Sequence, residues 1–412
     1  MGEWKTCTLA DLGTIVGGAT PSTKKAENYD GGTVPWVTPK DLSGYSYRYI
    51  SHGERNITEA GLKSCSTQMM PKNSVLFTSR APIGYVAIAE NDICTNQGFK
   101  SIVPNESTDY MFLYYLLKYN KDNIENMGSG TTFKEVSGTT MRGIQVSVPV
   151  EIEEQKKIAR VLASLDDKIE ENMKINDNLY EQIQTICNAW LVDYEPFGGC
   201  CPSDWVETPL SDIAEFIGGY SYKGEELQPS NIAMATIKNF ERKGGFKLEG
   251  YKEIIPSSKF KQSQRAELFD TLVAHTDLTQ NADVIGNAEV ILSKAGYDDI
   301  VFSMDLVKVL PKHNGISKFL IAALLHSENF KAHCLGYVNG TTVLHLNKKA
   351  LPDYCLMLPA DFTVLKPLDD VVSSFYKQIS CNIDESIHLS ALRDSLLPRL
   401  MSGSLDVSTL DL

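Results

Sequence analysis

The fold of this chain is decided by residues 151–190, which read EIEEQKKIARVLASLDDKIEENMKINDNLYEQIQTICNAW. From Ile158 onward, positions spaced alternately by four and three residues form one unbroken series, and most of them are apolar. That spacing is typical of a helix that packs along a single seam against another helix. The seam consists of Ile158, Leu162, Leu165, Ile169, Asn172, Asn176, Leu179, Ile183, Ile186 and Trp190. We therefore expect a long coiled-coil helix within residues 151–195.

The same seam recurs 210 positions later in the chain. It then consists of Leu368, Val372, Phe375, Ile379, Asn382, Ser386, Leu389, Arg393, Leu396 and Leu400. In each helix the adjacent polar pair lies at the middle of the seam, so two helices with opposed centres would bring the amides together. Parallel helices would align the polar pairs equally well. The direction is predicted by connectivity instead, because equivalent domains at opposite ends of the pair require antiparallel helices.

The sequence that precedes each helix is also repeated. Residues 4–18 recur without a gap 201 positions later, matching Trp4 with Trp205, Leu9 with Leu210, Asp11 with Asp212 and Gly17-Gly18 with Gly218-Gly219. The paired glycines suit a turn or an approach to phosphate, and a turn is the commoner use. Residues 74–77 and 85–88 read as strands, and residues 111–118 read as a helix.

We predict an α+β chain with a pseudo-two-fold internal repeat: two similar globular domains separated by two long antiparallel coiled-coil helices. The predicted boundaries are 1–150 for the first domain, 151–195 for the first helix, 196–360 for the second domain, and 361–412 for the second helix with a tail.

Composition narrows the class of protein. The 412 residues contain no run of 18 apolar residues, and the nine cysteines and seven histidines show no metal-ligand spacing. No phosphate-binding loop, dinucleotide fingerprint or nucleophile elbow is present. We expect a cytoplasmic protein with no membrane span, metal, disulfide or catalytic residue of its own. An enzyme with two pseudo-symmetric catalytic domains is disfavoured.

The distribution of charge matters more than its total. A net charge of −13 argues against binding to nucleic acid. However, residues 1–150 are neutral and residues 196–360 carry −3, whereas the two helical segments carry −6 and −4. The acidity is concentrated on the helices, and the globular domains remain free to bind a polyanion.

The strongest binding signal lies in residues 238–265, where eight basic residues meet only three acidic ones. Four aromatic residues, Phe240, Phe246, Tyr251 and Phe260, are interleaved with them. This combination suits neutralisation of phosphates with nearby contacts to bases, although a solvated hairpin surface is an equally good interpretation. The corresponding stretch of the first domain, around residues 40–55, is less basic.

Several motifs, taken in order, cover nearly the whole chain. They are the repeated opening at 4–18, WVTPKDL at 36–42, SRAPIG at 79–84, NQGFKSI at 96–102, GSGTT at 128–132, EQKKIA at 154–159, WLVDYEP at 190–196 and RDSLLPRLMSG at 393–403. With them the chain resembles the specificity subunits of type I restriction-modification systems. The second domain departs from the pattern, with AHTD at 274–277 in place of SRAP and no counterpart of QGFK.

The resemblance implies two target-recognition domains, each reading one half of an asymmetric bipartite DNA site. It also implies that the helices dock two methyltransferase subunits and set the distance between half-sites, and that motor-nuclease subunits join the complex. The partners, and not this chain, would use S-adenosylmethionine, ATP and magnesium. A free-standing DNA-bridging protein or a coiled-coil scaffold without nucleic acid remains the alternative.

The candidate contacts to double-stranded DNA combine the basic stretches with the family motifs. They are Thr38, Lys40, Arg48, Arg55, Arg80 and Lys100 in the first domain, and Lys238, Arg242, Lys243, Lys247, Lys259, Lys261 and Arg265 in the second.

Overall fold

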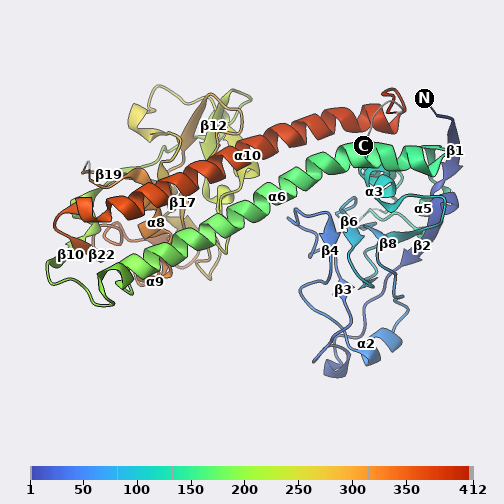
Figure 1. The fold of residues 1–412 in the computed structure, drawn as a ribbon, viewed down its shortest axis with the longest axis horizontal. Coiled ribbons are helices and arrows are strands. Elements are labelled where there is room, and N and C mark those ends of the chain that lie inside the picture. Colours follow the sequence, from blue (N-terminus) through green and yellow to red (C-terminus); the bar gives the residue numbers. More distant parts are fainter. Residues whose placement is uncertain (1, 81, 131–133, 314, 408–412) are drawn as a thin grey trace. The chain divides into compact units, whose positions relative to one another are not determined.

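A computed structural model describes residues 2–80, 82–130, 134–313 and 315–407. It divides into two compact units, one formed by Met1–Glu170 with His388–Leu412 and the other by Glu171–Ile387. Two long helices, α6 (Ile152–Leu191) and α10 (Lys366–Met401), contribute to both units and are the longest elements in Figure 1. Each unit therefore combines one predicted globular domain with part of each predicted helix.

Helices α6 and α10 form the predicted seam. None of its residues is exposed, and they range from half-buried to fully buried. In the first unit Leu162 and Leu400 belong to one apolar cluster, and in the second unit Ile183 and Val372 belong to another. Helix α6 begins just after Pro149 with two glutamates in its first turn, where the helix dipole favours negative charge.

The polar residues of the seam pair across the two helices within the second unit. The Asn172 Nδ2 donates to Ser386 Oγ at 3.2 Å and to Glu385 Oε2 at 2.7 Å. The Asn382 Nδ2 donates to Asn176 Oδ1 at 2.8 Å. As residue numbers rise along α6 they fall along α10, so the helices are antiparallel as predicted (Figure 1). These bonds offset part of the cost of burying the amides, although Asn172 Oδ1 has no partner among the described residues.

The first unit is built on a five-stranded sheet in the order β2-β8-β5-β6-β4. The strands of this unit are β1 (Trp4–Thr8), β2 (Gly13–Gly17), β3 (Trp36–Val37), β4 (Tyr49–Ile50), β5 (Val75–Phe77), β6 (Val86–Ala89), β7 (Cys94–Thr95), β8 (Lys100–Pro104) and β9 (Gln145–Pro149). Its helices before α6 are α1 (Leu9–Leu12), α2 (Glu59–Lys63), α3 (Tyr110–Tyr119), α4 (Lys121–Asn126) and α5 (Gly138–Gly143). The predicted strands and helix correspond to β5, β6 and α3, and the apolar side chains of α3 lie in the core beneath α6.

The second unit repeats this plan with more strands. Its strands are β10 (Trp205–Pro209), β11 (Ala214–Gly218), β12 (Ile232–Ala235), β13 (Lys252–Glu253), β14 (Arg265–Ala266), β15 (Thr271–Ala274), β16 (Thr276–Asp277), β17 (Ala288–Val290), β18 (Asp299–Phe302), β19 (Leu306–Pro311), β20 (Val338–Asn339), β21 (Leu344–Leu346) and β22 (Cys355–Pro359). Its helices are α7 (Leu210–Ile213), α8 (Lys318–Leu325) and α9 (Glu328–Leu335). Strand order β11-β19-β15-β17 reproduces β2-β8-β5-β6 of the first unit.

The register of the strands confirms the internal repeat. The residue pair Trp4 and Pro149, between β1 and β9, corresponds to Trp205 and Pro359, between β10 and β22. In the next pair of strands, Pro104 faces the first residue of β2 and Pro311 faces the first residue of β11. The gapless match of residues 4–18 therefore preserves both the strands and their partners.

The paired glycines have a different role from the turn that the sequence suggested. A Cβ on Gly18 would lie 2.1 Å from the carbonyl oxygen of Asn96, and one on Gly219 would lie 2.0 Å from that of Ser303. Neither glycine has a positive φ, so no left-handed turn requires it. The repeated glycine instead allows two backbone segments to touch, and the first glycine of each pair has no such neighbour.

This contact gives a matched pair of substitutions. Gly219→Ala should lower the free energy of unfolding by about 2 kcal/mol, because the new methyl group meets backbone that cannot rotate away. Gly218→Ala should change it by less than about 0.5 kcal/mol, since a Cβ there has nothing within 4 Å. Urea unfolding monitored by circular dichroism measures both values, and equal losses for the two variants would contradict the assigned contact.

Candidate nucleic-acid interface

The basic stretch of the second unit is a surface of short turns and strands. It contains the 3-10 turns at Ile237–Asn239, Leu248–Gly250 and Gln262–Gln264 together with β13 and β14. Six of the predicted contacts are exposed: Lys238, Arg242, Lys243, Lys247, Lys259 and Lys261. The seventh, Arg265, is half-buried and forms an ion pair with Asp299.

The exposed cations differ in how freely they can meet a phosphate. Lys247 lies 3.5 Å from Glu241, and Arg242 lies 3.6 Å from Asp283. Within the part of the chain that the structure describes, the other four exposed cations of the stretch, Lys238, Lys243, Lys259 and Lys261, have no carboxylate within ion-pair distance. Their charge is therefore the least compensated, and Lys243 lies at the tip of the turn.

The interleaved aromatic residues pack inward and support the surface. The Phe246 ring lies 5.8 Å from Phe240 and 5.6 Å from Tyr251, measured between centroids, and Tyr251 continues to Tyr297 at 6.2 Å. Phe240 is buried, and the Phe260 ring packs against Tyr220 at 5.7 Å. Phe240 is too buried to contact a base, whereas Phe246, Tyr251 and Phe260 are only half-buried, so their contact with bases stays a prediction.

In the first unit a cluster of cations surrounds one carboxylate. Arg80 Nη2 lies 2.6 Å from Glu135 Oε2, and Lys100 Nζ lies 3.7 Å from Glu135 Oε1. The side chains of Lys100 and Arg142 both border Gly138, and Lys134 is exposed next to Glu135. Sequence reasoning missed Lys134 and Arg142, although both follow the GSGTT motif closely. Residues Ala81, Thr131 and Thr132 of the family motifs lie outside the described residues.

Three other predicted contacts of the first unit lie at the surface in different settings. Lys40 pairs with Glu54 at 2.7 Å, and the Arg55 guanidinium lies 3.7 Å from the centre of the Tyr29 ring. Thr38 donates to Asp41 Oδ2 from its amide and its hydroxyl, both at 2.7 Å, so it closes the turn that presents Lys40. Lys40 and Arg55 are therefore exposed and can reach DNA, whereas the hydroxyl of Thr38 is used in the turn with Asp41.

Arg48 does not belong with the candidate DNA contacts. Only 4% of this residue is exposed, and its guanidinium lies against α6, where it pairs with Glu170 at 2.9 Å and with Asp167. Burial opposes its charge, but the hydrogen bonds from Glu170 and Asp167 outweigh burial and raise the pKa of Arg48. Sequence alone could not distinguish it from its exposed neighbours, because its partners are about 120 positions away.

Arg48→Met should therefore lower stability and leave DNA recognition to the exposed cations. We expect a loss of about 2 kcal/mol in the free energy of unfolding, because Glu170 is left as a mostly buried carboxylate without its partner. Arg55→Met is the matched control, since that arginine is exposed on the same stretch of chain. Denaturant titration of both variants measures the difference, and equal stability would contradict the anchoring role.

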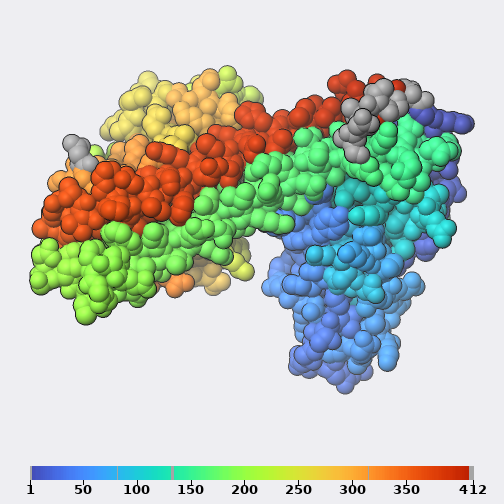
Figure 2. All heavy atoms as spheres, viewed as in Figure 1, coloured from blue at the N-terminus to red at the C-terminus, as the bar shows by residue number. Residues whose placement is uncertain are grey.

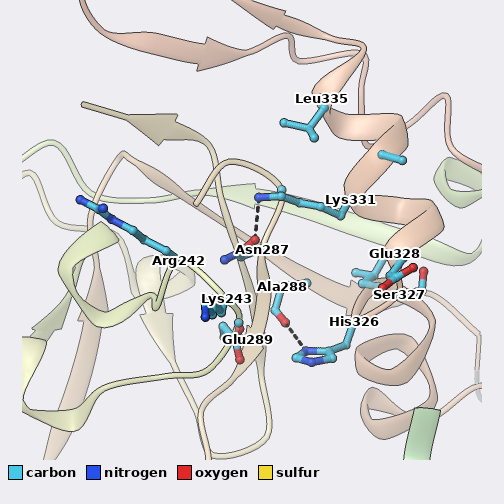
Figure 3. A pocket seen from close by; sticks show the side chains of 14 residues that line it. Arg242, Lys243, Asn287, Ala288, Glu289, His326, Ser327, Glu328, Lys331 and Leu335 are labelled. Atoms are coloured by element: carbon cyan, nitrogen blue, oxygen red, sulfur yellow. Dashed lines mark hydrogen bonds between the residues drawn. The ribbon is translucent and has the colours of Figure 1, made fainter. Parts of the chain in front are cut away.

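A cleft of about 330 Å³ lies beside the tip of the basic stretch, within the second unit (Figure 3). Its lining includes Arg242, Lys243, Glu289 and His326. Figure 3 shows Lys331 reaching from α9 to Asn287, and His326 Nδ1 meets the carbonyl oxygen of Ala288 at 3.1 Å. The Glu289 side chain is buried, which raises the pKa of its carboxyl.

All nine cysteines are free thiols. Among the described residues, no group of three or more His, Cys, Asp or Glu side chains could hold a metal ion. No helix in the described parts of the chain is long and apolar enough to cross a membrane.

Comparison with known proteins gives matches along the whole chain. Residues 1–181 match the family model described as the type I restriction modification DNA specificity domain. The chain is 31% identical to the type I restriction enzyme MjaIX specificity subunit of Methanocaldococcus jannaschii, over 99% of this chain and 95% of that protein. It is 28% identical to the EcoR124I/EcoR124II specificity subunit of Escherichia coli, over 40% of this chain and 41% of that protein.

A solved structure has the same fold. The crystal structure of a type I restriction-modification S subunit from M. genitalium superposes with a TM-score of 0.56 and 17% identity, covering 97% of this chain and 96% of that one. This likeness supports the architecture of two α+β domains with two long helices.

Proposed function

This chain belongs to the family of type I restriction enzyme specificity subunits, and from that premise we propose that it selects the DNA sequence on which a type I restriction-modification complex acts. The observation that carries the proposal is the 31% identity to a specificity subunit over 99% of the chain. Uncompensated cations on the second unit and the Arg80–Lys100 cluster on the first support contact with a polyanion.

The two units would read two different half-sites. They share strand order and register, so their backbones can approach DNA in equivalent ways. Their surfaces differ, because the first presents Arg80 and Lys100 around Glu135 whereas the second has His275 and Thr276 at the corresponding place. A shared scaffold with different surface side chains favours an asymmetric bipartite site.

The helices would dock the partner subunits and set the distance between half-sites. Their outer residues are acidic overall, and Figure 2 shows the green atoms of α6 and the red atoms of α10 uncovered on the viewed face. Such a surface suits a protein partner better than DNA. We propose that two methyltransferase subunits and the motor-nuclease subunits bring the chemistry, with S-adenosylmethionine, ATP and magnesium, and that this chain is not catalytic.

The experiment that tests the function is methylation mapping. The chain is co-expressed with the methyltransferase subunit encoded beside it in a host without adenine methylation, and the methylated adenines of the genome are sequenced. We expect methylation at one split motif and a stable complex of the two proteins. A chain that forms no complex and directs no methylation would instead be a DNA-bridging or scaffold protein.

The second unit gives a sharper prediction for the purified complex. Lys243→Glu together with Lys247→Glu should weaken DNA binding and flatten its salt dependence, because each lost phosphate contact reduces the slope of log K against log salt by about one. Binding is measured by fluorescence anisotropy over a range of salt concentrations. The control is charge reversal at Lys348 and Lys349, two exposed lysines outside the basic stretch. Unchanged binding in the first variant would remove this surface from the interface.

A further inference from the structure

We propose that Glu289 and Asn287 are positioning residues that hold the basic hairpin, residues 240–247, in the conformation with which the second unit reads DNA. This inference rests on the proposed function and adds to it the side chains that determine where the reading surface lies. Neither residue is among the candidate contacts, and neither can neutralise a phosphate.

The hairpin has a tight tip that needs external support. Its stem is closed by the Phe240–Phe246 pair, and the Glu241 amide donates to the Gly245 carbonyl at 2.9 Å. Gly244 and Gly245 both have positive φ, at 90° and 115°, a region that residues with a side chain rarely occupy. Glycines give the tip its shape but also let it move, since they restrict the backbone least.

Two hydrogen bonds fix the tip to the sheet beneath it. The Gly245 amide donates to Glu289 Oε1 at 2.7 Å, and Asn287 Nδ2 donates to the carbonyl oxygen of Glu241 at 2.8 Å. Glu289 lies within β17, which pairs with β15, and Asn287 immediately precedes it. The two ends of the turn are thus bound to β17 and to the residue just before it, and Arg242 and Lys243 lie between the bonded positions.

A third residue braces this support from the other side. Lys331 Nζ donates to Asn287 Oδ1 at 2.7 Å, to the carbonyl oxygen of Ile285 at 2.6 Å and to that of Asp283 at 2.9 Å. All three ammonium hydrogens are engaged, so Lys331 is not available to a phosphate. Lys331 takes the amide oxygen of Asn287, as Figure 3 shows. The Nδ2 group is therefore left to donate to the carbonyl oxygen of Glu241.

The burial of Glu289 indicates that its carboxyl serves to hold the hairpin. The residue is 2% exposed, and among the described residues no cation lies within ion-pair distance of it. Burying a carboxyl without an ion pair lowers the stability of the fold. The described contact that accounts for a carboxyl at this position is its hydrogen bond to the Gly245 amide. An exposed lysine on a flexible stem supplies affinity, whereas discrimination between bases requires that the backbone carrying it be fixed.

The test maps methylation by the complex of the full chain with its methyltransferase subunit. Glu289→Leu removes the acceptor for Gly245, and Asn287→Ala removes the donor to Glu241. In each variant we expect the preference for the correct base over a mismatched one to fall about tenfold in one half-site, with the other half-site unchanged. The salt slope of DNA binding should stay at its wild-type value, because every lysine and arginine remains.

Two control variants separate positioning from general damage. Glu289→Gln keeps an oxygen acceptor and should restore discrimination to near the wild-type value. Asp369→Asn and Asp369→Leu alter another carboxyl of the same unit, which is half-buried and accepts the Ser317 N–H bond, outside the basic stretch. Both should leave the two half-sites as they are.

Each outcome bears on the positioning role. Retained discrimination in Glu289→Leu, or an equal loss in Asp369→Leu, would overturn it. If Glu289→Leu does not fold, the same measurement is made on Asn287→Ala, and unchanged discrimination there would also overturn the positioning role. A wild-type complex that methylates no split motif would instead refute the proposed function.

Discussion

The structure depends on the antiparallel pairing of α6 and α10, and that pairing depends on the buried amides. Asn172 and Asn382 are almost fully buried, and each donates across the seam. A shift of one helix along the other by a single turn would break these bonds and place two of the four polar seam residues opposite apolar side chains. Apolar seams tolerate such shifts, because leucine and isoleucine pack against many neighbours, whereas hydrogen bonds have direction and a short range. The polar layer therefore determines register, and the apolar residues supply most of the buried area.

The internal repeat explains how one backbone can present two surfaces. The backbone contacts that build each unit are repeated, including the strand register and the glycine packed against a carbonyl. Surface side chains are free of these constraints. The first unit places Arg80, Lys100 and Glu135 together, and the second places lysines on a glycine-tipped hairpin. Divergence at such positions changes the chemistry of the surface while the scaffold stays the same.

Sequence predicted the parts of the structure that follow from periodicity and repetition. The helices, their seam and the repeat were all visible, because each is a regular pattern within one stretch of chain. Prediction from sequence failed where the contact that places a side chain comes from a residue far away along the chain. Arg48 looked like its neighbour Arg55, but Glu170 lies 122 positions away and takes its guanidinium into the interior. The packing of Tyr251 on the remote ring of Tyr297 was hidden from the sequence for the same reason.

The same limit separates affinity from specificity in the second unit. A run of lysines can be recognised in a sequence, and it indicates where a polyanion can bind. The residues that would make the binding selective are Glu289, Asn287 and Lys331, which belong to a strand, the turn before it and a helix, all far along the chain from the hairpin. In isolation each has an ordinary interpretation: a strand glutamate, a turn asparagine and a helix lysine. Only the folded chain shows that Glu289 and Asn287 bond the backbone groups at either side of Arg242 and Lys243, and that Lys331 holds Asn287. A recognition surface is therefore defined by its supports as much as by its charges, because a cation whose backbone can drift contacts any phosphate but distinguishes no base.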